Sequence, residues 1–414
     1  MNVNPSGLGP TSPWQPFFDI VEGILSRMSE SLRANLALAI AGFTCFALLY
    51  GTQPILPQLT HEFGVSPATA SLTVASGTGA MAILLIPLSL FADRYGRERL
   101  MRWGLAGAGA FAFFSAVAPD FLVLFASRVG LGACIAGVPA AAMAYLGDEV
   151  PPEERARAMG LYIAANALGG MSGRFIVAGV TGWLDWRHGL ASLGLLGTVS
   201  AIVFWRLLPP ARHFTPRSME PKALTADLRA IAADPGLPAI FGVGFLVLGI
   251  FVGAYNYLAF RLSAPPYGLG PGAIGAIFAL YAIGSVTSAW TGYAMGRLGR
   301  SRIILGAGLA SISGLLVTLF SPLPVVILGL AIFTIGFFAA HTVASTWVGK
   351  RGGARRGLVS ALYLSGYYLG ASVIGSAAGW PWSAAGWPGV VAFLLACTGL
   401  LLALGIHLRR LDDD

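Results

Sequence analysis

Ser89-Leu90-Phe91-Ala92-Asp93-Arg94-Tyr95-Gly96-Arg97-Glu98-Arg99 is a short charged turn at the end of a long apolar run. A similar turn, Gly296-Arg297-Leu298-Gly299-Arg300-Ser301-Arg302, ends another apolar run, and the offset from Asp93 to Gly296 is 203 positions. Near-constant offsets in separate segments predict a duplicated unit. Other pairs at offsets of 201 to 205 are Leu161-Tyr162 with Leu362-Tyr363, Leu168-Gly169 with Leu369-Gly370, and Tyr50 with Tyr255.

The composition around these turns is that of a membrane protein. Hydrophobic residues make up 56% of the chain and charged residues 11%, and the mean hydropathy is +0.73. A soluble domain usually carries about 25% charged residues, so too little charge is present to cover a water-exposed surface. Cys45, Cys134 and Cys397 lie singly in apolar stretches, which argues against a zinc site or a disulfide framework.

Charged residues divide the chain into membrane-spanning segments. A bilayer core about 30 Å thick needs roughly 20 apolar residues in a helix. The sequence therefore predicts an all-α polytopic membrane protein with twelve transmembrane helices in two pseudo-symmetric six-helix bundles. The predicted parts are a cytoplasmic segment at 1–33, a first bundle at 34–207, a cytoplasmic linker at 208–235, a second bundle at 236–408 and a tail at 409–414.

Basic residues predict the orientation of the chain. All but four of the 26 Lys and Arg residues lie at the termini or in even-numbered loops, which places both termini in the cytoplasm. The net charge of +8 is therefore a topology signal and does not indicate nucleic acid binding. Apolar residues of segment 1–33 recur at helical spacing, which fits either an amphipathic helix on the cytoplasmic leaflet or a poorly ordered tail.

The turn at 89–99 resembles motif A of the major facilitator superfamily, and the resemblance extends over residues 35 to 408. Ser89 stands where the first glycine of that motif is expected, which implies looser packing of spans two and eleven. The chain also resembles the YnfM-like transporters of the drug/proton antiporter branch, at Ala47-Leu48-Leu49-Tyr50, Gln53-Pro54-Ile55-Leu56-Pro57, Gly169-Gly170-Met171-Ser172-Gly173-Arg174 and Gly336-Phe337-Phe338-Ala339-Ala340-His341. The resemblance implies a monomer in a bacterial inner membrane that binds a small molecule between its halves.

The charged turn suggests a gate. Asp93 can cap the N-terminus of span eleven, where free N–H groups favour negative charge, and Arg97 can pair with Asp148 at the end of span four. Resemblance to the family implies that this latch closes the cytoplasmic side. The alternative is that the charges only mark topology. The complete set of candidate gating residues is Ser89, Asp93, Arg94, Gly96, Arg97 and Asp148.

Three ionisable residues within spans are candidates for coupling. Burying Arg128 and Arg174 is costly, so both should face protein or a wet cavity. By resemblance, Arg128 lies where the family often has a functional arginine, whereas Arg174 replaces a common proline of the antiporter motif. Histidine is the side chain whose unperturbed pKa lies near neutrality, so His341 could carry a proton. Structural roles remain the alternative for all three residues.

Acidic residues are missing from the middle of every predicted span. A cavity with only basic groups should prefer neutral, zwitterionic or anionic amphipathic compounds. Polar and aromatic residues that could line it, with helix packing as the alternative, are Tyr50, Gln53, Asn166, Tyr255, Asn256, Tyr257, Tyr363, Tyr367 and Tyr368.

The favoured function is proton-coupled efflux of small amphipathic compounds by alternating access, without a cofactor. A sugar, metabolite or lipid-linked carrier, or a uniporter, is the first alternative, and a membrane sensor that does not transport is another. An enzyme is not expected, because the chain has no HExxH motif, intramembrane Asp pair or Ser/His constellation.

Overall fold

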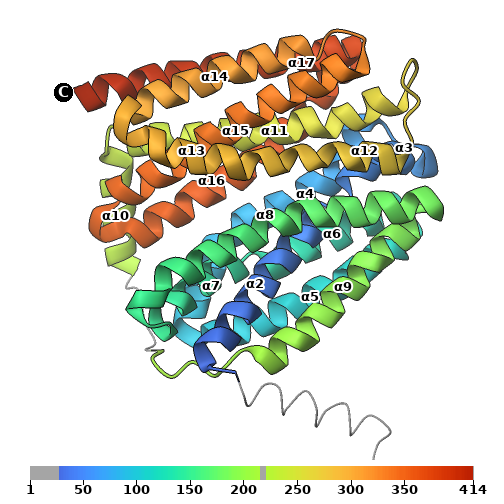
Figure 1. Ribbon diagram of the computed structural model, residues 1–414. Helices are drawn as coiled ribbons and strands as arrows, with labels where there is room; N and C mark the ends of the chain where they lie inside the picture. The colour runs from blue at the N-terminus through green and yellow to red at the C-terminus, as the bar shows by residue number, and fades with distance from the viewer. Residues whose placement is uncertain (1–27, 215–220, 414) are drawn as a thin grey trace, which may run out of the picture.

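The computed structural model describes residues 28–214 and 221–413 (Figure 1). Every regular element in this part of the chain is a helix, which confirms the predicted all-α fold. The N-half contains α2 (Glu30–Leu49), η1 (Gln53–Ile55), α3 (Leu56–Phe63), α4 (Pro67–Tyr95), α5 (Arg97–Ala116), α6 (Phe121–Ile135), α7 (Val138–Glu149), α8 (Pro152–Trp183) and α9 (Trp186–Leu207). The linker contains α10 (Pro221–Ala233). The C-half contains α11 (Leu237–Ser263), α12 (Pro271–Ile277), η2 (Phe278–Leu280), α13 (Tyr281–Leu298), α14 (Arg300–Val317), α15 (Leu323–Arg351), η3 (Gly353–Arg355), α16 (Arg356–Ala377) and α17 (Gly379–Asp413).

Eleven helical segments in the described residues are long and apolar enough to cross a membrane. The predicted third span corresponds to α5, which is not one of these eleven. Its first six residues include Arg97, Glu98, Arg99 and Arg102, and it packs between α6 and α9. With α5 included, the helical segments correspond one to one to the twelve predicted spans.

The two halves repeat each other in backbone detail. Gly96 joins α4 to α5 with a φ of 110°, and Gly299 joins α13 to α14 with a φ of 79°. Only glycine adopts these left-handed values readily, which explains the glycine in both charged turns. The contacts repeat as well: a Cβ on Gly169 would collide with the backbone of Phe43, and a Cβ on Gly370 would collide with that of Phe245.

Three of the spans are interrupted along their length. The first span stops at Leu49 and continues as η1 and α3, the fourth is divided into α6 and α7, and the eighth passes from α12 through η2 into α13. The end of a helix leaves backbone carbonyl groups without partners in that helix. The interruption of the first span therefore leaves the carbonyls of Leu48 and Leu49 to other donors inside the protein.

Helical structure extends into the predicted linker and the predicted tail. The predicted linker contains the helix α10, and α17 continues through the predicted tail to Asp413. The amphipathic segment proposed within residues 1–33 lies almost entirely outside the described residues.

One end of the bundle, here called the terminal side, carries the start of α2, the helix α10 and the end of α17; the opposite end is the far side. In Figure 1 the two halves come together where α12 lies near α8, and α10 lies at the other end. Within the described residues, the hydrogen bonds between the halves join Gln53 to Asn256 (2.8 Å), Tyr257 to Ser71 (3.2 Å) and Ser372 to the carbonyl of Ala75 (2.8 Å). These bonds, together with the contact of Gly275 with Ala178, form what we call the far-side interface.

Candidate substrate and coupling site

Arg174 lies at the centre of the far-side interface and is 3% exposed. Its Nε donates to Gln53 Oε1 at 2.6 Å, and its Nη1 donates to the Gly170 carbonyl. The guanidinium carbon lies 4.4 Å from the ring centre of Tyr50, 5.1 Å from that of Phe278 and 4.9 Å from that of Tyr281. Arg174 and these three rings are called the Arg174 cage below.

The cage holds a positive charge without a negative partner. No Asp or Glu among the described residues forms an ion pair with Arg174. An arginine at the centre of a span costs roughly 2.5–3.5 kcal/mol. A desolvated cation–π contact contributes about 2 kcal/mol, and a hydrogen bond from a charged group about 1.5–3 kcal/mol, so the rings and the two acceptors can offset this cost.

Gln53 connects the cage to the other half of the protein. Its amide oxygen accepts from Arg174, and its amide nitrogen donates to Asn256 Oδ1 at 2.8 Å. Gln53 and Asn256 are both almost completely buried. Because Phe278 and Tyr281 also come from the C-half, both the cage and this chain of hydrogen bonds join the two halves.

A series of aromatic contacts links the cage to His341. Phe251 lies 5.1 Å from Tyr281 and stacks on Phe337 at 3.8 Å between ring centres, and Phe337 is parallel to His341 at 6.1 Å. The His341 ring also stacks on Tyr367 at 4.6 Å. This ring series joins two predicted coupling candidates, Arg174 and His341, through residues of α11, α13 and α15.

His341 is half-buried beside predicted lining residues. Its Nδ1 lies 3.2 Å from the hydroxyl oxygen of Tyr363. Tyr367 packs edge-on against Tyr368, which in turn lies 6.4 Å from Phe46 of the N-half. The imidazole therefore has one hydrogen-bonding neighbour and is stacked with Phe337, Tyr363 and Tyr367, with no carboxylate paired to it among the described residues.

Arg128 occupies a different environment. It is 1% exposed, and it donates from Nε to the Thr73 carbonyl (3.1 Å), from Nη1 to that of Leu48 (3.0 Å) and from Nη2 to that of Leu49. Leu48 and Leu49 end α2, so Arg128 satisfies carbonyl groups that the broken first span leaves free. This geometry supports the structural alternative for Arg128 over a coupling role.

The charged turn lies on the terminal side. Arg97 donates to Asp93 at 2.9 and 3.1 Å and also forms an ion pair with Asp148. No described hydrogen bond joins Asp93 to α16. Ser89 bonds the carbonyl of Ile86 in its own helix, and the exposed Arg94 lies over the Tyr95 ring. The latch role of these residues stays a prediction.

A second terminal-side ion pair joins the linker to the C-half. Arg351 at the end of α15 donates to Asp234 at 2.6 Å. Burial alone would raise the pKa of Asp234, but Arg351 and the backbone N–H groups of Leu237 and Gly236 hold this pKa below its usual value.

The remaining predicted lining residues lie at three separate places in the structure. Tyr255 packs on Phe278 and Tyr281 and shares a hydrogen bond with Thr334. Tyr257 belongs to the far-side interface. Asn166 lies beside Gly42, and its Oδ1 is buried without a hydrogen-bonding partner.

Sequence reasoning missed four rings of the site: Phe251, Phe278, Tyr281 and Phe337. The one available signal was the spacing of Phe337 and His341, which are four positions apart and therefore share a helix face. No group of three or more His, Cys, Asp or Glu residues that could hold a metal ion occurs among the described residues.

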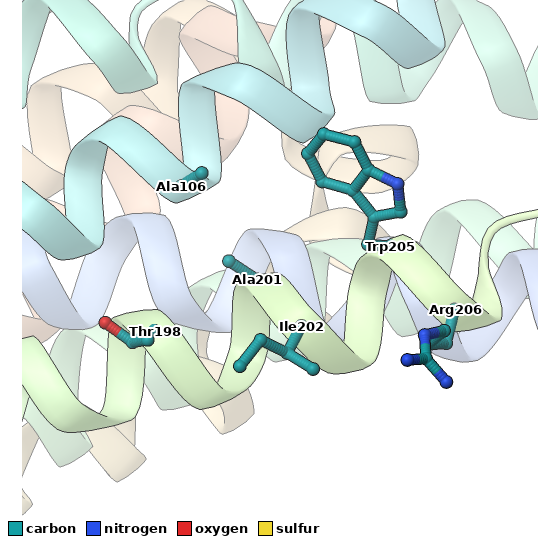
Figure 2. A pocket seen from close by; sticks show the side chains of 6 residues that line it. All are labelled: Ala106, Thr198, Ala201, Ile202, Trp205 and Arg206. Atoms are coloured by element: carbon teal, nitrogen blue, oxygen red, sulfur yellow. The ribbon is translucent and has the colours of Figure 1, made fainter. Parts of the chain in front are cut away.

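A surface groove of about 310 Å³ lies away from this site, between α5 and α9. Figure 2 shows Trp205 and Arg206 at one end of the groove and Thr198 at the other. Ile202 and Trp205 are exposed on this outer face, which meets lipid when the protein is in a bilayer. The groove is therefore no part of the candidate site between the halves.

Comparison with known proteins identifies the family. Residues 38–375 match the Major Facilitator Superfamily. The chain is 39% identical over 381 residues to the inner membrane transport protein YnfM of Escherichia coli, covering 92% of this chain and 91% of that protein. It is 36% identical over 378 residues to the uncharacterized MFS-type transporter YybF of Bacillus subtilis, covering 91% and 94%.

Solved structures show the same fold at lower identity. A bacterial homolog of the lysosomal transporter Spinster superposes with a TM-score of 0.72 at 19% identity, covering 92% of this chain and 95% of that one. The nucleoside transporter NupG superposes with a TM-score of 0.73 at 15% identity, covering 90% and 98%. On the evidence of its duplicated helical halves and of these matches, the chain is a multi-pass membrane transporter of the Major Facilitator Superfamily.

Proposed function

We propose that this protein is a secondary active transporter that exports small amphipathic compounds by alternating access and is driven by protons. The observation that carries the proposal is the far-side interface, where two repeated halves meet around the buried charge of Arg174. An interface of packed helices, hydrogen bonds and ring contacts between two separate halves can open and re-form, as alternating access requires.

Lys and Arg are concentrated in the termini and loops of the terminal side, which assigns this side to the cytoplasmic face of a bacterial inner membrane. The state described here is then closed toward the periplasm. In the opposite state, the Asp93, Arg97 and Asp148 cluster would close the cytoplasmic side as a latch. No cofactor takes part in this scheme, and a monomer is sufficient for it.

His341 is the proposed proton carrier. An arginine side chain keeps its proton at any physiological pH, so Arg128 and Arg174 cannot carry one. Imidazole titrates near neutrality, and His341 lies on the ring series that leads to the cage. Its protonation would add a second positive charge to this region and change how the halves pack.

The test uses purified protein in liposomes with an imposed pH gradient. Lumenal pH is recorded after addition of cationic, neutral and anionic amphipathic compounds to wild type and to His341→Gln. We expect substrate-dependent proton flux in wild type and its loss in the variant, with substrate counterflow retained. Counterflow without proton movement in wild type would refute proton coupling and favour a uniporter.

A further inference from the structure

The Arg174 guanidinium has donor capacity that its protein contacts do not use. A guanidinium carries five N–H donors. The described hydrogen bonds of Arg174 start from Nε and Nη1, and none starts from Nη2. Arg128, by contrast, uses all three of its nitrogen atoms on backbone carbonyls. Of the two arginines buried in the middle of spans, Arg128 and Arg174, only Arg174 has a free donor nitrogen for an additional partner.

The contacts of Arg174 depend on the state of the transporter. Tyr50, Gln53 and Gly170 belong to the N-half and stay with Arg174 when the halves move. Phe278 and Tyr281 belong to the C-half, so separation at the far side removes these two rings from the cation. The loss exposes one face of a guanidinium that has no carboxylate partner in the described protein.

We propose that Arg174 binds the carboxylate group of an organic anion when the far side is open. The proposal rests on the proposed function only in requiring that the halves alternate. A guanidinium matches a carboxylate with two parallel N–H···O bonds, which makes the pair strong and orientated. The Tyr50 ring offers an apolar surface for the body of the same molecule.

The unpaired positive charge of Arg174 also disfavours cations at this site. No described acidic residue pairs with Arg174, so an ammonium group placed there would meet an unshielded positive charge. A neutral amide could accept from the guanidinium but would lack the charge that strengthens the bond. The predicted order of affinity is therefore carboxylate, then amide, then ammonium.

Binding is measured by calorimetry on detergent-purified full-length protein. The probes share one ring system and differ in charge: 1-naphthoate, 1-naphthamide and 1-naphthylmethylammonium. We expect the carboxylate to bind wild type at least about tenfold more tightly than the amide. A hydrogen bond with a charged partner supplies a ratio of this size. Equal affinity for carboxylate and amide, or no binding of the carboxylate, would overturn the proposal.

Three variants test the residue. Arg174→Gln should abolish the preference for carboxylate over amide. Arg174→Lys should still prefer the carboxylate, because the positive charge remains, but should bind it more weakly. Arg187→Gln removes one positive charge from a residue whose described contacts all lie in the N-half, and it should leave the preference unchanged. A preference that survives in a folded Arg174→Gln protein would contradict the assignment.

Cross-linking tests the dependence on state. A Cβ on Gly182 of α8 would lie 3.9 Å from the Cα of Gly272 of α12. Cysteines at both positions, with the native cysteines replaced, can be joined by a short bis-methanethiosulfonate and released by reductant. We expect joining to weaken carboxylate binding about tenfold and release to restore it. Full affinity in the joined protein would contradict binding in the far-side-open state.

The two proposals fail separately. Proton flux driven by neutral compounds, without a carboxylate preference, would leave the proposed function intact and refute the anion site. Carboxylate binding that depends on Arg174, without proton flux, would refute proton coupling and leave the anion site intact.

Discussion

Gln53 and Asn256 form a hydrogen bond of 2.8 Å between residues 203 positions apart. The same offset relates Asp93 to Gly296 and Gly96 to Gly299 in the two charged turns. The two amides come from opposite halves and meet where the halves meet. Their bond must break in any state in which the far side is open.

The first prediction concerns this bond. Asn256→Leu removes it but leaves Gln53 to accept from Arg174. A hydrogen bond contributes about 1 kcal/mol, so the equilibrium should shift about fivefold toward the far-side-open state. Distances between spin labels on α8 and α12 measure the two populations.

The matched control for that prediction is Tyr255→Phe. It removes a hydrogen bond to Thr334 that lies wholly inside the C-half. Its label distances should match those of wild type. If both variants shift the populations equally, the Gln53–Asn256 bond has no special part in closure.

The second prediction assigns Arg128 to stability. Arg128→Gln leaves backbone carbonyls without their charged donor, and each buried group left unsatisfied costs about 1–3 kcal/mol. We expect a loss of about 3 kcal/mol or more, seen as a lower thermal midpoint in detergent. Arg128→Lys should lose nearly as much, because one ammonium cannot reproduce the fork that reaches three carbonyls.

Arg297→Gln is the control, since this exposed arginine should change stability by less than about 0.5 kcal/mol. An Arg128→Gln protein as stable as wild type that has lost proton flux would reverse the assignment and restore the coupling role.

These two arginines show how far the sequence could predict the structure. The duplicated turns predicted the repeat, and its glycines proved to have the left-handed backbone that the turns need. The sequence also singled out Arg128 and Arg174 as costly buried charges. It could not separate their roles, because the partners of Arg128 are carbonyls whose availability depends on where α2 ends.

Phe278 and Tyr281 were missed for a related reason. They contact Arg174 from η2 and from the start of α13, and no proline marks this 3-10 turn in the sequence. Gln53 and Asn256 were predicted as lining residues, but their contact depends on how the halves are docked. Contacts between distant segments of this kind do not follow from local sequence patterns.

The third prediction concerns the pair of Asp234 and Arg351. Asp234→Asn should lower the free energy of unfolding by about 1 kcal/mol at neutral pH. Because folding lowers the pKa of Asp234, its contribution is present above the unfolded value of 3.8 and is lost as pH falls through the folded value. The stability difference between wild type and variant should therefore disappear in strong acid.

Asp227→Asn is the comparison for this pair, since Asp227 lies at the same 2.6 Å from Arg355 but both side chains are more exposed. It should change the thermal midpoint less than Asp234→Asn does at neutral pH. A difference for Asp234→Asn that grows in acid would contradict the depressed pKa.

The most direct test of alternating access is counterflow in liposomes with the halves cross-linked through cysteines at Gly182 and Gly272. The control is a cross-link inside the N-half, between a cysteine introduced at Gly107 and the native Cys134. A Cβ on residue 107 would lie 3.5 Å from the Cβ of Cys134. We predict that the link between halves stops counterflow until reductant is added, while the link within the N-half does not. Undiminished counterflow with the halves joined would contradict the account.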